Sequence, residues 1–152
     1  GTKIHQVAEN VDGIMWARGA RQSSPYKTYG YSFYEFRTLD GTIFRYVRRP
    51  DGSVIEEKAE SPKSRYLISQ NPPSAIGSDF SKHDFVINEV PSNRELARHT
   101  RIFYRGGWFS KFYGGPGLTM QSCPYPDTFD SGRFISTVLK PSIREGKSNG
   151  GA

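Results

Sequence analysis

Two Asp-Gly pairs, spaced one strand length apart, constrain the fold of this chain more than any other local feature. Asp40-Gly41 and Asp51-Gly52 separate three runs that are rich in aromatic and β-branched residues: Ser32–Thr38, Thr42–Arg48 and Ser53–Ala59. Glycine accepts the positive φ that a tight hairpin turn requires, so Asp-Gly between such runs is a strong hairpin signal. The sequence therefore predicts a three-stranded antiparallel meander over residues 28–59.

The remaining segments predict an α+β fold around that meander. The apolar residues between Ile4 and Val11 follow helical spacing, so we expect a short N-terminal helix. Ser92 and Glu95 have the spacing of a capping box, which predicts a second short helix. Further strands are expected at Tyr66–Ile68, Asp84–Val90, His99–Tyr104 and Arg133–Leu139. The prediction is a short N-terminal helix and a twisted, mainly antiparallel sheet of about five to seven strands.

Composition favours a single folded domain. Only 35% of the 152 residues are hydrophobic, but 14% are aromatic, and large rings supply much buried area per residue. We expect one globular domain over residues 1–141 and a flexible tail over 142–152. Cys123 is the single cysteine, which is typical of a cytoplasmic protein or of one delivered into the cytosol of a target cell. No signal peptide or apolar run of membrane-spanning length is visible, so no membrane partner is expected.

The distribution of charge indicates an anionic partner. The net charge is +6, and the Lys/Arg excess lies at the two ends of the chain. Eight Lys/Arg oppose four Asp/Glu in residues 1–50, six oppose eight in residues 51–100, and seven oppose three in residues 101–152. Two basic ends around a slightly acidic middle suit a domain that attracts a polyanion or a phosphate-bearing ligand. The alternative is that the charge serves solubility alone.

Two segments in the last third of the chain are candidates for a nucleotide cleft. Arg105 follows an apolar run and precedes Gly106 and Gly107. A guanidinium there can contact a pyrophosphate with two prongs, while the glycines let the ligand approach the backbone. Ser136 and Thr137 follow in a run that is predicted to be a neighbouring strand.

This pattern resembles the first two motifs of the arginine-type ADP-ribosyltransferases, in which an arginine is followed by a Ser-Thr-Ser strand and then by a glutamate. The resemblance implies NAD as the cofactor, and ADP-ribosyl transfer or NAD cleavage as the activity. It also implies that Arg105 holds the pyrophosphate and that Ser136 and Thr137 shape the cleft. The third position of the strand motif is Val138 rather than serine, and the only later acid is Glu145. The alternative is an ordinary strand that ends in a turn.

A glycine-rich loop begins at Tyr113-Gly114. Its backbone N–H groups are candidates for holding a phosphate, and the loop is a candidate mobile segment over a substrate. No Gly-Lys-Ser/Thr follows as in a P-loop, and no βαβ pattern surrounds it as in a Rossmann fold. The alternative is a simple turn.

Three side chains are candidates for general acid–base chemistry: Glu35, His83 and His99. Cleavage of RNA through its 2′-hydroxyl needs a base, an acid and a cation that stabilises the phosphorane. Histidine, glutamate and arginine can supply these without a metal, and no His/Cys cluster with metal-ligand spacing is visible. The alternative is that each is an ordinary surface or core residue.

Binding without catalysis is a further alternative. Aromatic residues from Tyr26 to Tyr46 are interleaved with cations from Lys27 to Arg49. On an antiparallel sheet, exposed rings stack on bases while cations meet phosphates, unless the rings form the core. The sequence therefore predicts a small basic effector or toxin-like domain that acts on a nucleotide-containing ligand, with NAD chemistry first. An RNA-directed domain, either a ribonuclease or a binder, is second, and a module that binds a protein target is third.

Overall fold

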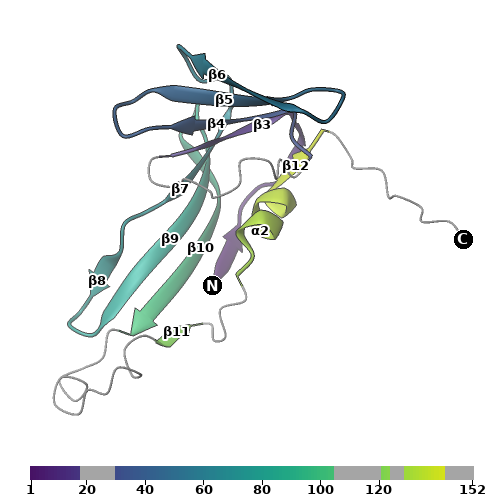
Figure 1. The fold of residues 1–152 in the computed structure, drawn as a ribbon. Helices are drawn as coiled ribbons and strands as arrows, with labels where there is room; N and C mark the ends of the chain where they lie inside the picture. Colours follow the sequence, from purple (N-terminus) through teal and green to yellow (C-terminus); the bar gives the residue numbers. More distant parts are fainter. Residues whose placement is uncertain (18–29, 105–120, 124–128, 143–152) are drawn as a thin grey trace, which may run out of the picture.

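The computed structural model describes residues 1–17, 30–104, 121–123 and 129–142, and this part of the chain is mostly β-structure (Figure 1). The strands of the large sheet are β1 (Thr2–Ile4), β3 (Gly13–Trp16), β4 (Phe33–Arg37), β5 (Ile43–Arg48), β6 (Val54–Ala59), β7 (Tyr66–Gln70), β8 (Ser74–Ile76), β9 (Phe80–Glu89), β10 (Arg94–Tyr104) and β11 (Gln121–Cys123). A second, parallel pair joins β2 (Ala8–Val11) to β12 (Leu139–Pro141), and the helix within the described residues is α2 (Ser131–Val138).

The large sheet is mixed and strongly twisted. Within the described residues its strand order is β1-β10-β9-β7-β3-β4-β5-β6, with β8 paired to β9 and β11 paired to β10. The central strand β3 is parallel to both β4 and β7, while the other neighbours are antiparallel. In Figure 1, β4 to β6 run across the direction of the long β9–β10 ribbon. All four residues of β3 are buried, which accounts for its uninterrupted apolar run.

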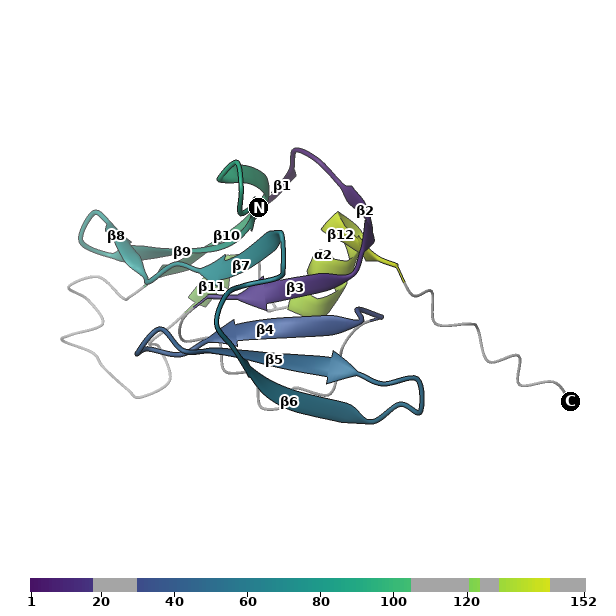
Figure 2. The same ribbon diagram turned by 90° about the horizontal axis from the view of Figure 1, so that it is seen from above.

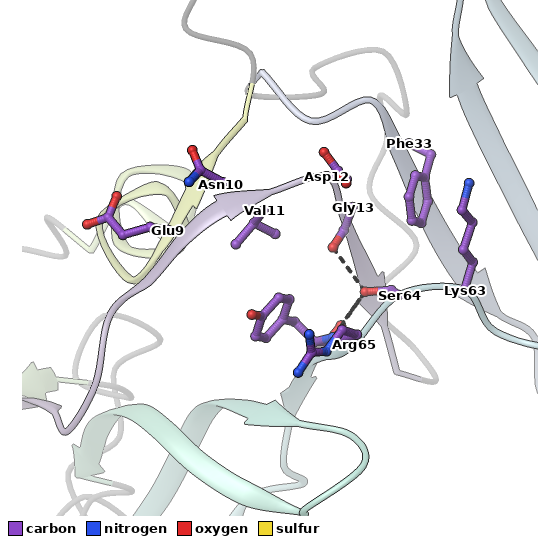
Figure 3. Close-up of a pocket in the computed structure, with 10 residues that line it drawn as sticks. Glu9, Asn10, Val11, Asp12, Gly13, Phe33, Lys63, Ser64 and Arg65 are labelled. Carbon is purple, nitrogen blue, oxygen red and sulfur yellow. Dashed lines mark hydrogen bonds between the residues drawn. The ribbon is translucent and has the colours of Figure 1, made fainter.

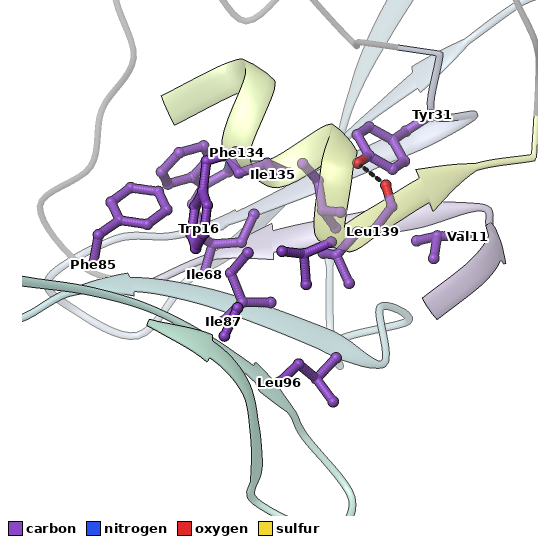
Figure 4. Packing of buried hydrophobic residues seen from close by; sticks show 13 residues of the cluster. Val11, Trp16, Tyr31, Ile68, Phe85, Ile87, Leu96, Phe134, Ile135 and Leu139 are labelled. Atoms are coloured by element: carbon purple, nitrogen blue, oxygen red, sulfur yellow. Dashed lines mark hydrogen bonds between the residues drawn. The ribbon is translucent and has the colours of Figure 1, made fainter. Parts of the chain in front are cut away.

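The core lies between α2 and one face of the sheet (Figure 4). We call this the helix-side face; it carries Ile14, Trp16, Ile68, Phe85 and Ile87, which pack with Phe134, Ile135 and Val138 of α2. The opposite face is called the far face. Figure 2 shows α2 and β12 side by side against the sheet. No helix among the described residues is long and apolar enough to cross a membrane.

Side-chain hydrogen bonds are present at both ends of α2. The Asp130 carboxylate caps α2 by accepting from the Arg133 N–H at 3.0 Å. The Tyr31 hydroxyl donates to the Leu139 carbonyl, and burial raises the pKa of that phenol. Ser142 N–H donates to the Val11 carbonyl at 3.0 Å, so the first residue of the predicted tail is bonded to β2; residues 143–152 lie outside the described part.

The predicted meander is confirmed. β4, β5 and β6 are antiparallel neighbours, with Tyr34 opposite Tyr46 and Tyr46 opposite Glu56. Gly41 and Gly52 have φ values of 89° and 84°, which is the positive φ that the Asp-Gly turns predict. The strands expected around Tyr66–Ile68, Asp84–Val90 and His99–Tyr104 are present within β7, β9 and β10.

The predicted N-terminal helix is wrong, and with it the α+β arrangement. The segment forms β1 and β2 instead, with Ile4 opposite Ala97 of β10. Asn10 has a φ of 53°, which an α-helix does not tolerate. Ile4 and Val7 are 44% and 38% exposed, so the apolar periodicity does not mark a buried helix face. In the described residues the helix lies near the C-terminal end and the fold is a large mixed sheet.

The capping-box helix is also wrong. Asn93 has a φ of 50° and lies in the turn between β9 and β10. The Ser92 hydroxyl donates to Glu89 at 2.8 Å, and the Glu95 carboxylate accepts from Arg98. The two side chains that would have closed the box therefore have partners in the hairpin.

The strand predicted at Arg133–Leu139 is a helix over most of its length. Its β-branched residues favoured a strand, but the Asp130 cap and the burial of Phe134, Ile135 and Val138 on one side fix α2 instead. Tertiary packing overrides propensity here.

Candidate functional site

Glu35 is fully buried and serves as a structural carboxylate. Its Oε1 accepts from Arg45 Nε at 2.8 Å and lies 2.7 Å from Arg45 Nη2. The backbone N–H groups of Lys63 and Ser64 each donate to it at 2.8 Å. Burial alone would lower the pKa of Arg45, but its hydrogen bonds to Glu35 and Glu57 outweigh burial and raise it. With no exposed surface, this carboxylate joins β4, β5 and the segment before β7.

A pocket of about 240 Å³ is lined in part by Lys63 and Ser64, the two residues whose N–H groups donate to Glu35 (Figure 3). The turn between β2 and β3 lines one side, and residues 63–66 line the other. Ser64 Oγ lies 3.0 Å from the Gly13 carbonyl oxygen and 2.9 Å from that of Tyr66. The Lys63 ammonium is 5.0 Å from the centre of the Phe33 ring. These contacts tie β3 to the segment before β7.

Gly13 makes the close approach of the Phe33 ring to β3 possible. It lies directly opposite Phe33, and a Cβ on Gly13 would be 2.2 Å from the Phe33 ring. The ring therefore covers the β3 backbone, and any side chain at position 13 would displace it. Both Gly13 and Phe33 line the pocket.

The helix-side face of the β9–β10 ribbon carries a histidine, an arginine and an aromatic ring near the end where β9 begins and β10 ends. We call His83, Arg101 and Phe103 the ribbon cluster. Arg101 lies directly opposite His83, and side chains two apart on a strand share a face. The His83 and Phe103 ring centres are 4.6 Å apart at 65°, and Arg101 Cζ is 5.1 Å from the centre of the Phe103 ring. All three residues are half-buried.

His99 lies on the same face, one row nearer the core. Its Nδ1 is 2.7 Å from Thr2 Oγ1, and its ring stacks on Phe129 with centres 3.8 Å apart at 7°. His99 is only 5% exposed. The structure thus brings two of the predicted acid–base candidates, His83 and His99, onto neighbouring strands, and places His99 in the core and His83 at its rim.

Aromatic side chains also lie on the helix-side face of the meander. We call this set the meander cluster: Tyr34 and Phe36 of β4, Phe44, Tyr46 and Arg48 of β5, and Lys58 of β6. Tyr34 and Tyr46 stack with centres 4.8 Å apart at 10°. The rings and Arg48 are half-buried, with Tyr34 and Phe36 packed against the core, and Lys58 is exposed, as is Glu56 opposite Tyr46. Tyr31 and Phe33, which the sequence grouped with them, are buried.

A charge network on the far face of the β9–β10 ribbon was not found from the sequence. Asp84 accepts from Arg98 and Thr100, both at 2.7 Å, and Lys82 Nζ lies 3.0 Å away. Burial favours the neutral acid, but these hydrogen bonds and the nearby charges hold the pKa of Asp84 below its ordinary value. The charged residues Lys82, Asp84 and Arg98 were the available signal, but their contact depends on strand register.

The residues proposed for NAD divide into two groups. Arg105, Gly106, Gly107, Tyr113 and Gly114 lie outside the described residues, and β10 ends at Tyr104.

Ser136 and Thr137 lie on α2 rather than on a strand beside β10. Their hydroxyls contact the Arg133 carbonyl at 3.1 and 2.8 Å. This is the local bonding of serine and threonine within a helix. NAD as a cofactor remains a prediction, but Ser136 and Thr137 are not on the strand that the prediction assumed.

In the described part of the chain, no three His, Cys, Asp or Glu side chains gather in a group that could hold a metal ion. Comparison with family models, curated proteins and solved structures found no match to this chain.

Proposed function

We propose that this protein binds single-stranded RNA on the helix-side face of its sheet. The observation that carries the proposal is the register of the meander, which puts the rings of Tyr34, Phe44 and Tyr46 on one face with two cations, Arg48 and Lys58, and one acid, Glu56. Stacking of a base on an aromatic side chain contributes about 1–3 kcal/mol, and neighbouring cations neutralise phosphates. The net charge of +6 favours the same class of partner.

The ribbon cluster supplies a second contact region on the same face. Five strand spacings, about 24 Å along the sheet, separate β5 from β10, and α2 packs over the strands between them. Arg101 and Phe103 again combine a cation with a ring. A ligand that meets both clusters is therefore a chain of several nucleotides rather than a mononucleotide.

Fluorescence anisotropy with a short labelled single-stranded RNA of mixed sequence tests this proposal. We expect affinity to fall steeply with salt, because each phosphate contact releases a counterion. Tyr46→Ala should lose about 1–3 kcal/mol, roughly 5- to 150-fold in affinity. Arg48→Glu should weaken binding, whereas the matched change Arg37→Glu, on the far face of β4, should have much less effect.

The outcome that contradicts the proposal is a folded protein with no saturable binding at low salt. Equal losses of affinity in Arg48→Glu and Arg37→Glu would also contradict it, because the RNA would then respond to the net charge rather than to one face of the sheet. Arg45 is unsuitable for this test, because it forms an ion pair with the buried Glu35 carboxylate. Single-stranded DNA of the same sequence reports whether the ribose hydroxyl contributes to affinity.

A further inference from the structure

A β-bulge sets which residue faces His83. Arg94 pairs with Glu89 and Glu95 pairs with Asn88, but the register shifts by one residue before Ala97 pairs with Ile87. If the register of the first two pairs continued along the ribbon, Thr100 would lie opposite His83. The one-residue shift puts Arg101 in that position instead. Bulges re-aim side chains in this way and are over-represented beside active sites.

His83 has the surroundings of a proton carrier. Its ring packs edge-on to Phe103, and among the described residues it makes no hydrogen bond. It is half-buried, so a ligand can reach it while one side of the ring remains fixed. A histidine that is positioned by packing, and whose nitrogens make no hydrogen bond within the described part of the chain, can exchange a proton with a bound hydroxyl.

Arg101 lies directly opposite His83, so a phosphate bound by its guanidinium would be close to the imidazole. Residues directly opposite each other on antiparallel strands have Cβ atoms about 4.5–5.5 Å apart. Phe103 contacts both side chains and lies two residues further along β10. A guanidinium fork can hold two phosphate oxygens and thereby present the phosphorus and the adjacent ribose to the imidazole.

We propose that His83 and Arg101 form a metal-independent site that cleaves the bound RNA through its 2′-hydroxyl, an inference that rests on the proposed RNA binding. His83 takes the proton of the 2′-hydroxyl, and the O2′ electron pair forms a bond to phosphorus. The bond from phosphorus to O5′ breaks, its electron pair stays on O5′, and solvent supplies the proton that completes the 5′-hydroxyl. The products are a 2′,3′-cyclic phosphate and a 5′-hydroxyl end. Arg101 stabilises the extra negative charge on the phosphorane oxygens.

The other candidate bases are placed elsewhere. Glu35 is fully buried against Arg45, and His99 is 5% exposed and stacked on Phe129. Asp84 lies on the far face, bonded to Arg98 and Thr100. Among the three acid–base candidates, His83 is the one that the described structure leaves at a ligand-accessible rim.

Incubation of the full chain with a fluorescent single-stranded RNA, followed by gel analysis of its ends, tests the inference. The wild type should yield cyclic-phosphate ends in the presence of a chelator. His83→Ala and His83→Asn should slow cleavage by about 10²–10⁴-fold, and Arg101→Lys by about 10²–10³-fold. His5→Ala, a change at an exposed histidine beside Glu95, is the matched control and should cleave as the wild type does.

Binding of the 2′-O-methyl form of the same RNA separates the two proposals. This probe cannot be cleaved, so its binding reports affinity without cleavage, and the His5→Ala control should bind it as the wild type does. If the wild type binds it but leaves the unmodified RNA intact, the catalytic inference is overturned and RNA binding stands. Cleavage that persists unchanged in both His83 variants overturns the assignment of His83. Absence of binding to the probe overturns both proposals.

Discussion

Removal of the buried Glu35 carboxylate should lower the stability of the fold rather than the affinity of the folded protein for RNA. In Glu35→Ala, the Arg45 guanidinium loses the partner at 2.7–2.8 Å, and the N–H groups of Lys63 and Ser64 lose their acceptor. Removing one partner of a buried ion pair costs about 3–5 kcal/mol. Arg45 is 18% exposed by side chain and keeps Glu57 at 3.2 Å, so we expect the lower end, about 3 kcal/mol.

Urea denaturation followed by far-ultraviolet circular dichroism measures that loss directly. For a chain of this size, about 3 kcal/mol corresponds to a fall in Tm of roughly 6–12 °C. Glu35→Gln keeps the side-chain volume and an acceptor oxygen, so it should lose less than Glu35→Ala. A double change, Glu35→Leu with Arg45→Met, should recover part of the loss because no buried charge remains unpaired.

A loss below about 1 kcal/mol in Glu35→Ala would refute the reasoning, since that is the range of an exposed pair. The structural role also predicts that folded Glu35→Gln binds RNA as the wild type does.

Two further changes test other parts of the fold. Gly13→Ala should cost about 1–3 kcal/mol in urea denaturation, because its Cβ would be 2.2–2.5 Å from atoms of the buried Phe33 ring; unchanged stability would show that the ring can move. The pKa of Asp84 is lowered in the folded state, so its contribution to stability is present above the ordinary pKa of about 4 and is lost as pH falls through the folded value. Asp84→Asn should therefore lower stability near neutral pH and flatten the fall in stability on acidification, and an acid profile parallel to that of the wild type would contradict this.

The parts of the fold that the sequence predicted are those fixed by adjacent residues. The Asp-Gly turns at 40–41 and 51–52 specify φ locally, and the meander follows from them. The N-terminal segment was mistaken for a helix because its strand partner, β10, lies far along the chain, with Thr2 opposite His99. Likewise, nothing near Met15 indicates that it lies beside Leu67 in a parallel pair.

The candidate site shows the same limit. His83 and His99 were recognisable as residue types suited to proton transfer. That Arg101 faces His83 depends on the bulge near Glu95, and that His99 is buried depends on Phe129 and α2. Both depend on contacts between residues far apart in the chain, which local sequence patterns do not predict.

Ultraviolet crosslinking of a single-stranded RNA to the protein, with the crosslinked residues mapped by mass spectrometry, tests the RNA-binding face most directly. We predict crosslinks at Tyr34, Phe44, Tyr46 and Phe103, all on the helix-side face, and their loss at high salt. Phe80 lies 44% exposed on the far face of the same sheet and provides the internal comparison. Crosslinks confined to Phe80 and the far face, or none at any salt concentration, would contradict the account.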